Sequence, residues 1–251
     1  MESKFYRPDE QRAEKVHELF ATIARRYDLL NDIMSVGMHR RWKRRLVELG
    51  GSPRDVLDLC CGTGDLASMF AQNGARVTGI DFTKEMLQVA TARTIAGGTP
   101  TPPTAEVAQP SQLRLSNWVQ ADALCLPFPD NSFDVVGVGY GLRNLADIER
   151  GLREALRVLR PGGKLLSLDF GKPESSLLRS MYFGYLRTVL PVLGRLFCGD
   201  PDTHGYILAS LQEYPAQRGI RMLMERGGYR DCGFEEFCGG TMAINFGSKS
   251  R

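Results

Sequence analysis

The sequence predicts an α/β fold in which helices cover a mostly parallel β-sheet. The first observation is that short apolar runs alternate with helical patterns along the 251 residues. Such alternation indicates βαβ crossovers, which make neighbouring strands parallel. The second observation is a strand that runs into glycines and continues as a helix, in the stretch VLDLCCGTGDLA at 56–67. Parallel sheets use such a turn where the backbone must approach a ligand closely.

Five strands and three intervening helices form the predicted core. The strands are 55–59, 76–80, 117–121, 133–139 and 164–170, and the helices are 64–72, 83–95 and 145–159. Pro and Gly in LRPGG at 159–163 predict a tight turn before the fifth strand. The final runs at 228–239 and 241–247 predict two more strands, joined at Gly239-Gly240 as an antiparallel hairpin, which makes a seven-stranded sheet.

One domain accommodates all of these elements. We expect a helical N-terminal cap at 1–50, the sheet core with its glycine turn at 51–170, a helical insertion at 171–227 and the terminal strands at 228–251. Pro, Gly and Thr dominate residues 96–116, which show no apolar period. This segment is therefore expected to be a flexible surface insertion.

Composition limits the classes of function. A formal net charge of +3 is too small to argue for a nucleic-acid partner. The first residues lack the apolar region of a secretory signal, and no apolar run is long enough to span a bilayer. The six cysteines and three histidines show no zinc-binding spacing, so we expect a reduced, cytoplasmic protein without a metal site.

The glycine turn and an acidic residue downstream predict an adenosine-containing ligand. Asp81 ends the second strand 19 residues beyond Gly62, where a carboxylate can accept hydrogen bonds from both ribose hydroxyls. A glycine turn with a purely structural role is the alternative, which the presence of Asp81 disfavours. The candidate cofactor-binding residues here are Asp58, Gly62, Thr63, Gly64, Asp81 and Phe82.

Two cofactors fit this turn. Residues 62–67 satisfy the dinucleotide pattern G-x-G-x-x-[GA], which would favour NAD. However, no second mononucleotide-binding half follows. Instead, Asp122 and Ala123 come directly after the third strand, where a carboxylate and a backbone amide can bind the edge of an adenine. S-adenosyl-L-methionine is therefore the favoured cofactor.

The sequence contains four segments that together resemble class I S-adenosylmethionine-dependent methyltransferases: LDLCCGTGDLA, GIDFTKEML, DALCLPFPDNSFD and ALRVLRPGGKL. Members of this class have a Rossmann-like fold. Outside the insertion, nearly the whole chain is similar to the ubiquinone/menaquinone biosynthesis C-methyltransferase family, above all at 20–44, 140–173 and 239–247. The insertion and residues 199–215 resemble the cyanobacterial and plastid branch, which methylates 2-phytyl-1,4-naphthoquinone in phylloquinone biosynthesis. The resemblance implies cofactor contacts at Thr63, Asp81, Asp122, Ala123 and Gly139, the last of which is often Ser in the family.

The implied reaction transfers a methyl group to a ring carbon of a prenylated quinol. A sulfonium methyl is strongly electrophilic, so the enzyme must chiefly position it and make the ring carbon electron-rich. A quinone is electron-poor, whereas a deprotonated quinol pushes charge onto that carbon. Because a phenol has a pKa of about 10, the site needs a base or a cation that stabilises the phenolate, and it must exclude water.

Arg143, Asn144 and Tyr27 are the candidate catalytic residues. Arg143-Asn144 follow the fourth strand, where the acceptor is expected, and would stabilise the oxyanion and hold a ring oxygen. Alternatively, Arg143 caps a helix or pairs with Asp147, and Tyr27 is a core aromatic. His39 and Asp169 are further candidates for a proton acceptor, although a structural His39 is the favoured interpretation.

A prenylated acceptor resides in a bilayer, so we expect peripheral contact with a thylakoid or plasma membrane. Residues 176–197 are apolar but interrupted by Arg and Pro, and would line a channel for the tail, lie at the interface or form a core or homodimer helix. The basic run 39–45 would attract anionic lipid or is a solvated face. The remaining alternatives are a methyltransferase acting on RNA or another small molecule, and a non-catalytic cofactor-binding protein.

Overall fold

The computed structural model describes residues 12–24, 27–35, 37–95, 115–198 and 202–251. Its centre is a seven-stranded sheet with the order β3-β2-β1-β4-β5-β7-β6. Strands β1 to β5 are parallel, whereas β7 runs antiparallel between β5 and β6. The bounds are β1 Asp55–Leu59, β2 Arg76–Asp81, β3 Leu115–Gln120, β4 Phe133–Gly139, β5 Leu159–Phe170, β6 Arg230–Phe237 and β7 Met242–Ser248. The predicted fold class and the terminal hairpin are confirmed.

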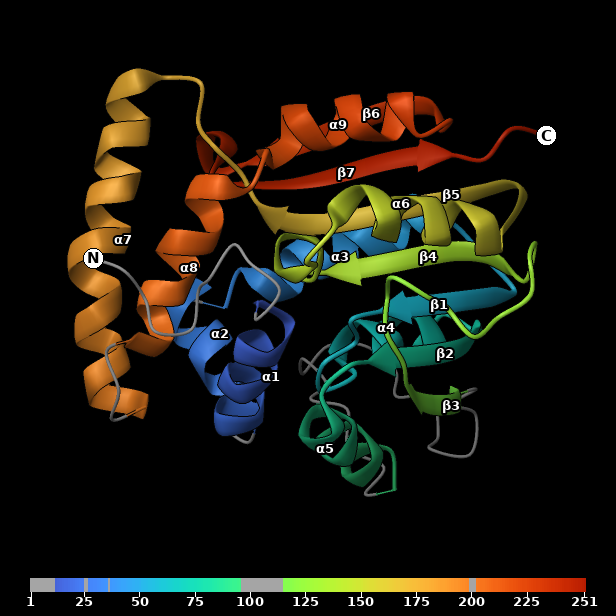
Figure 1. The fold of residues 1–251 in the computed structure, drawn as a ribbon, viewed down its shortest axis with the longest axis horizontal. Coiled ribbons are helices and arrows are strands. Elements are labelled where there is room, and N and C mark those ends of the chain that lie inside the picture. The colour runs from blue at the N-terminus through green and yellow to red at the C-terminus, as the bar shows by residue number, and fades with distance from the viewer. Residues whose placement is uncertain (1–11, 25–26, 36, 96–114, 199–201) are drawn as a thin grey trace.

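Helices cover both faces of this sheet (Figure 1). On one face α3 (His39–Gly50) and α4 (Asp65–Gln72) bury Trp42, Leu46 and Phe70 against the strands. On the other, α6 (Ile148–Val158) and α9 (Ala216–Arg226) bury residues such as Leu152 and Ile220. Helix α5 (Lys84–Ile95) packs beside β2 and β3. This double layer holds the ends of the parallel strands in fixed positions.

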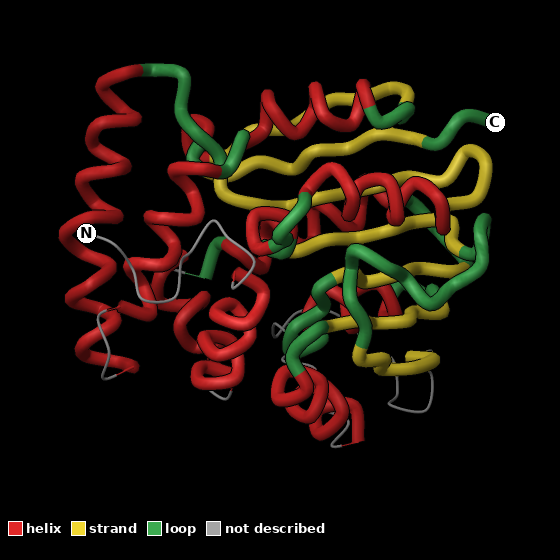
Figure 2. The backbone as a smooth tube through the Cα atoms, viewed as in Figure 1, coloured by secondary structure: helices red, strands yellow, loops and turns green. Residues whose placement is uncertain are grey.

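Four further helices gather beyond the carboxyl ends of the parallel strands, apart from the two layers that cover the sheet (Figures 1 and 2). They are α1 (Arg12–Ile23), α2 (Tyr27–Ser35), α7 (Ser176–Cys198) and α8 (Asp202–Glu213). Helix α7 runs alongside α8, and α8 contacts the short 3-10 helix η3 (Leu142–Asn144). Parallel sheets bind ligands at this end, so the cap and the insertion enclose the expected site.

Most expected boundaries differ from the structure by one or two residues, and β3 begins at Leu115, inside the expected insertion 96–116. Two larger differences have a clear cause. The helix predicted at 145–159 begins at Ile148, because the Asp147 side chain accepts a hydrogen bond from the Arg150 N–H (2.9 Å) and caps α6. Strand β5 begins at Leu159 rather than 164, since Leu159 pairs with Phe133 and the predicted turn forms a bulge before pairing resumes at Lys164.

Residues 96–114 of the predicted insertion lie outside the described part of the chain. Within the described ranges, no helix has both the length and the apolarity needed to cross a bilayer.

Candidate functional site

The turn after β1 has a backbone that only glycine adopts easily. Gly62 has a φ of 55° and Gly64 a φ of 78°. A Cβ atom on Gly64 would lie 2.5 Å from Cη2 of Trp118, so no larger residue fits. Gly64 thus lets α4 start close to the sheet, with its first N–H groups at the carboxyl ends of the strands.

Asp81, at the end of β2, joins this turn to the next one. Its Oδ2 accepts a hydrogen bond from the Gly62 N–H (2.8 Å), and its Oδ1 accepts one from the Thr83 N–H (2.8 Å). Burial raises the pKa of Asp81, and the two backbone hydrogen bonds oppose this shift. The Thr83 side chain also hydrogen-bonds this carboxylate, which keeps capacity for a further hydrogen bond, so the ribose assignment fits the geometry.

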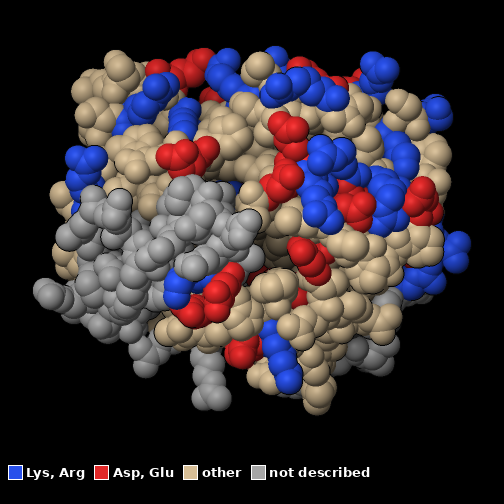
Figure 3. Space-filling view, in the orientation of Figure 1, with Lys and Arg blue, Asp and Glu red and all other residues tan. Residues whose placement is uncertain are grey.

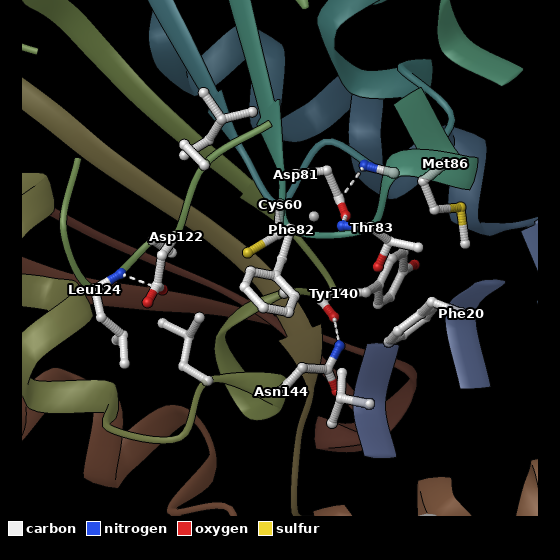
Figure 4. A pocket seen from close by; sticks show the side chains of 18 of the residues that line it. Phe20, Cys60, Asp81, Phe82, Thr83, Met86, Asp122, Leu124, Tyr140 and Asn144 are labelled. Carbon is white, nitrogen blue, oxygen red and sulfur yellow. Dashed lines mark hydrogen bonds between the residues drawn. The ribbon is translucent and has the colours of Figure 1, made fainter. Parts of the chain in front are cut away.

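A first cavity of about 180 Å³ opens beside Asp81. It is lined by six of the predicted cofactor-binding residues: Gly62, Asp81, Phe82, Asp122, Ala123 and Gly139. Figure 4 shows Asp81, Asp122 and Asn144 around it, with Phe20 reaching in from α1. Asp122 accepts a hydrogen bond from the Leu124 N–H (2.9 Å), which fixes the loop that would face an adenine.

The other predicted residues of the turn lie deeper. Thr63 and Asp58 line a small cavity of about 20 Å³. The Thr63 hydroxyl donates to Asp28 Oδ1 of α2 (2.9 Å) and so ties the cap to the turn. Gly64 packs against Trp118 and lines neither this cavity nor the first one.

Asp58 presents a buried carboxyl group to the small cavity. Its Oδ2 accepts a hydrogen bond from the Ala67 N–H (2.8 Å), whereas its Oδ1 has no hydrogen-bond partner in the described part of the chain. Burial raises the pKa of Asp58 to about 8. A buried acidic oxygen of this kind fits a cationic group such as the ammonium of S-adenosylmethionine.

The basic run 39–45 is only partly a solvated face. Lys43 Nζ lies 2.7 Å from Asp65 Oδ2, and the two side chains are only 6% and 18% exposed. His39 and Trp42 are also buried, whereas Arg41 and Arg44 are exposed. The interpretation of the run as a surface charge is therefore wrong for Lys43, which joins α3 to the first turn of α4.

A second cavity of about 260 Å³ lies between the sheet end and helices α1, α2, α3, α7 and α8. Its lining is rich in aromatic side chains, which include Phe20, Trp42, Phe170, Tyr182, Tyr185 and Tyr206. Its polar groups include Asn31, Ser35, His39 and Arg143. Phe20, Tyr27 and Tyr140 line both cavities, so two ligands bound in them would meet there.

Arg143 lies in η3 with its side chain buried. Its Nη1 donates to Asp169 Oδ1 (2.5 Å) and to the Tyr140 carbonyl oxygen (2.9 Å), and its guanidinium lies 4.8 Å from the Phe170 ring centroid. Burial lowers and Asp169 raises the pKa of Arg143, with a net upward shift, so this cation stays charged. The alternative pairing with Asp147 is wrong, because Asp147 caps α6. Asp169 is a counterion here rather than a free base.

Asn144 and Tyr27 flank the junction of the cavities. Asn144 Nδ2 donates to the Tyr140 carbonyl oxygen (3.1 Å), and its Oδ1 accepts from the Tyr206 hydroxyl (2.9 Å). Burial raises the pKa of Tyr27, while Lys43 and Arg143 lower it. The structure thus places all three candidate catalytic residues, Arg143, Asn144 and Tyr27, at the two cavities.

Several residues of the site are not indicated by any pattern in the sequence. Tyr206 lies on α8, 62 residues after Asn144 in the sequence, and its hydroxyl positions the Asn144 side chain. Tyr140 occupies a strained position with a φ of 63° between the two cavities. The pattern YGLRN contains Tyr140, but nothing in it indicates the left-handed backbone. Among the described residues, no group of three His, Cys, Asp or Glu side chains is placed to bind a metal ion.

Comparison with known proteins agrees with this geometry. The model of the ubiE/COQ5 methyltransferase family matches residues 8–249. The chain is 38% identical to the ubiquinone/menaquinone biosynthesis C-methyltransferase UbiE of Teredinibacter turnerae, over 95% of this chain and 93% of the relative. It is 40% identical to the protein of the same name from Ectopseudomonas mendocina, over 96% and 91%.

Solved structures share the fold. A putative methyltransferase from Bacillus halodurans superposes with a TM-score of 0.56 at 18% identity, covering 83% of this chain and 99% of that one. A Haemonchus contortus phosphoethanolamine N-methyltransferase, in complex with S-adenosyl-L-methionine, superposes with a TM-score of 0.57 at 16% identity, covering 84% and 53%. The fold is that of class I methyltransferases, and S-adenosylmethionine is the cofactor. The chain therefore belongs to the ubiE/COQ5 methyltransferase family, the S-adenosylmethionine-dependent C-methyltransferases of ubiquinone and menaquinone biosynthesis.

Proposed function

We propose that this protein methylates a ring carbon of a prenylated 1,4-naphthoquinol, with 2-phytyl-1,4-naphthoquinol as the favoured acceptor, in the final step of phylloquinone or menaquinone biosynthesis. The observation that carries the proposal is the pair of adjoining cavities. The first contains the predicted cofactor-binding residues, and the second is an aromatic chamber with a buried cation, Arg143.

The chemistry follows from these surroundings. Bound S-adenosylmethionine supplies an electrophilic methyl group. Arg143 stabilises negative charge that develops on the quinol oxygen, in a chamber where low polarity strengthens the attraction. Asn144 is held by Tyr140 and Tyr206 and can bond a second ring oxygen. Tyr27 lies between the two cavities and orients the reactants, while the aromatic walls exclude water.

Two observations favour a naphthoquinol over other acceptors. Flat aromatic side chains line the second cavity, which suits a bicyclic ring. Figure 3 shows Lys and Arg interspersed with Asp and Glu over one face rather than a continuous basic surface, and on α6 Arg157 pairs with Glu154 and Asp130. An RNA substrate would require a basic surface with exposed stacking aromatics.

Competition between acceptors tests the proposal. The purified protein would receive reduced naphthoquinol and benzoquinol acceptors with the same prenyl tail, and kcat/KM would be measured for each. We expect a preference of at least about tenfold for the naphthoquinol, equivalent to about 1.4 kcal/mol of transition-state stabilisation. An equal or greater kcat/KM for the benzoquinol would contradict the naphthoquinol assignment. Methylation of RNA alone would contradict the quinol proposal entirely.

We propose further that the protein works at the cytoplasmic surface of a membrane through α7. This helix carries an exposed apolar stripe, spaced by one turn, in which the exposed fractions are 71% for Leu177, 64% for Met181, 41% for Tyr185, 37% for Val189 and 57% for Val192. Tyr185 also lines the second cavity. The stripe is therefore continuous with the chamber that would hold the quinol ring, which supports a route for the tail into lipid.

Vesicle binding tests this surface. Co-sedimentation with phosphatidylcholine vesicles should fall strongly in the double variant Leu177→Asp/Met181→Asp, because charged groups do not enter the acyl region. Met222→Asp on α9 is the matched control, since Met222 is equally large and 54% exposed but lies outside the stripe. Unchanged vesicle binding, or a double variant that instead turns a dimer into a monomer on size exclusion, would contradict the membrane assignment.

A further inference from the structure

The second cavity needs a proton acceptor that the groups assigned so far do not provide. A quinol hydroxyl must lose its proton before the ring carbon becomes strongly nucleophilic. Arg143 is permanently charged and cannot accept a proton, and Asp169 is committed to Arg143. Tyrosines keep their proton near pH 7, and burial raises the pKa of Tyr27 and Tyr140 further. Among the described residues that line the cavity, only His39 remains as a base.

Hydrogen bonds fix the ring of His39 in one tautomer. Ser35 has a single hydroxyl proton, which it donates to the Asn31 carbonyl oxygen (2.6 Å). Ser35 Oγ lies 2.8 Å from His39 Nδ1 and can therefore only accept a hydrogen bond from it. Nδ1 thus carries the proton, and Nε2 has a free lone pair. No described residue forms a hydrogen bond with Nε2.

The charges around His39 suit a base that acts reversibly. Asp32 Oδ1 lies 3.7 Å from Nδ1 and stabilises the protonated ring, while Arg40 holds Asp32 in place through a 2.7 Å bond. Burial chiefly, and then Lys43 and Arg40, lower the pKa of His39, whereas Asp65 and Asp32 raise it. The net shift is downward, so the ring is neutral at pH 7. Arg143, Tyr27 and Tyr140 line the same chamber.

We propose that His39 is the catalytic base of the reaction and that Ser35 and Asp32 are its positioning residues; the inference rests on the proposed function. Nε2 accepts the proton of the quinol hydroxyl. The electron pair of the adjacent ring carbon then forms the new C–CH₃ bond, while the S–CH₃ bond breaks and leaves its electrons on sulfur. The ring carbon loses its hydrogen to water as a proton, and the imidazolium returns its proton to the oxygen. One proton is released overall.

The test compares His39→Gln with Asp32→Asn in the full-length protein. General bases contribute about 10²- to 10⁴-fold, so His39→Gln should lower kcat at least about 100-fold. The KM for the naphthoquinol and the affinity for S-adenosylhomocysteine should stay within about threefold, because the lost group acts in the transition state. The residual rate should rise with pH as hydroxide forms the phenolate. Glu48→Gln, an exposed change on the same helix, is the control.

Asp32→Asn separates catalysis from folding. Loss of the negative charge beside Nδ1 lowers the pKa of His39 and should therefore move the acidic limb of the kcat–pH profile to lower pH. In the wild type, imidazole ¹⁵N chemical shifts should report the Nδ1–H tautomer. A kcat for His39→Gln near the wild-type value, an unmoved limb in Asp32→Asn or an Nε2–H tautomer would each overturn the base assignment. A wild-type protein that methylates no quinol would instead overturn the proposed function.

Discussion

Arg143 and Asp169 form a buried ion pair in which Nη1 and Oδ1 are 2.5 Å apart and the side chains are 6% and 3% exposed. The carboxylate also accepts hydrogen bonds from the backbone N–H groups of Arg143 (3.2 Å) and Phe170 (2.9 Å). It thereby fixes the end of β5 to η3. The pair both stabilises the fold and sets the direction of the cation that faces the second cavity.

Removal of one partner of this pair should be costly. Asp169→Asn leaves Arg143 buried without its counterion, and we expect a loss of about 3–5 kcal/mol in the free energy of unfolding, measured with urea. The double variant Arg143→Met/Asp169→Leu should recover only part of that stability and none of the methyl transfer. It removes the buried charges, but it leaves the backbone N–H groups of Arg143 and Phe170 without their acceptor. A single variant as stable as the wild type would show that the pair is not desolvated.

Tyr206→Phe removes the hydroxyl that donates to Asn144 Oδ1. Because a typical hydrogen bond contributes about 0.5–1.5 kcal/mol, we expect kcat to fall about 2- to 10-fold, with little change in cofactor affinity. Tyr229→Phe is the matched control, since its hydroxyl bonds the Leu152 carbonyl oxygen (2.8 Å) in the core. It should lower the melting temperature and leave kcat unchanged. Equal effects of the two variants on kcat would refute the positioning role of Tyr206.

Asp81→Asn should weaken cofactor binding. The ribose hydroxyls lose a charged acceptor, and hydrogen bonds to charged groups contribute about 1.5–3 kcal/mol, so the Kd for S-adenosylhomocysteine should rise at least about tenfold. The melting temperature should also fall, because the Gly62 N–H loses its carboxylate partner. Glu149→Gln, on the exposed side of α6, controls for loss of charge. An unchanged Kd, measured by calorimetry, would remove Asp81 from the ribose site.

Cofactor binding should release a proton from Asp58. The pKa of this carboxyl is raised to about 8, so it is mostly protonated at pH 7 in the free protein. A bound cation favours the carboxylate, lowers the pKa and expels the proton, which means that affinity rises as pH rises toward 8. The folding stability of the free protein has the opposite pH dependence. Because folded Asp58 holds a proton that the unfolded chain releases, the free energy of unfolding falls as pH rises toward 8. Calorimetry in buffers of different ionisation enthalpy would show the proton in the wild type but not in Asp58→Asn.

The sheet could be predicted because its signals are local. Apolar runs, a glycine turn and Asp81 lie close together in the sequence, and each constrains backbone geometry directly. The bulge in β5 could not be predicted, since Pro and Gly at 159–163 are equally typical of a turn and the pairing with Phe133 depends on a strand more than twenty residues earlier.

The residues that line the second cavity were harder to predict from the sequence, because the cavity forms by packing of segments that are far apart in the chain. His39 and Lys43 belong to a run that looks solvated, yet helix α3 buries them while it exposes Arg41 and Arg44. Likewise, the partner of Arg143 is Asp169 on β5 rather than nearby Asp147, which the N-cap of α6 occupies. Local pairing rules favour neighbours and cannot anticipate such a choice.

The most direct measurement supplies S-[methyl-³H]adenosylmethionine and demethylated 2-phytyl-1,4-naphthoquinone, with and without chemical reduction of the quinone. The quinones would then be extracted and separated by chromatography. We expect label on the ring only after reduction, because only the quinol can form the phenolate that Arg143 stabilises. Labelling of the oxidised quinone, or no labelling of either form by a protein that binds S-adenosylhomocysteine, would contradict it.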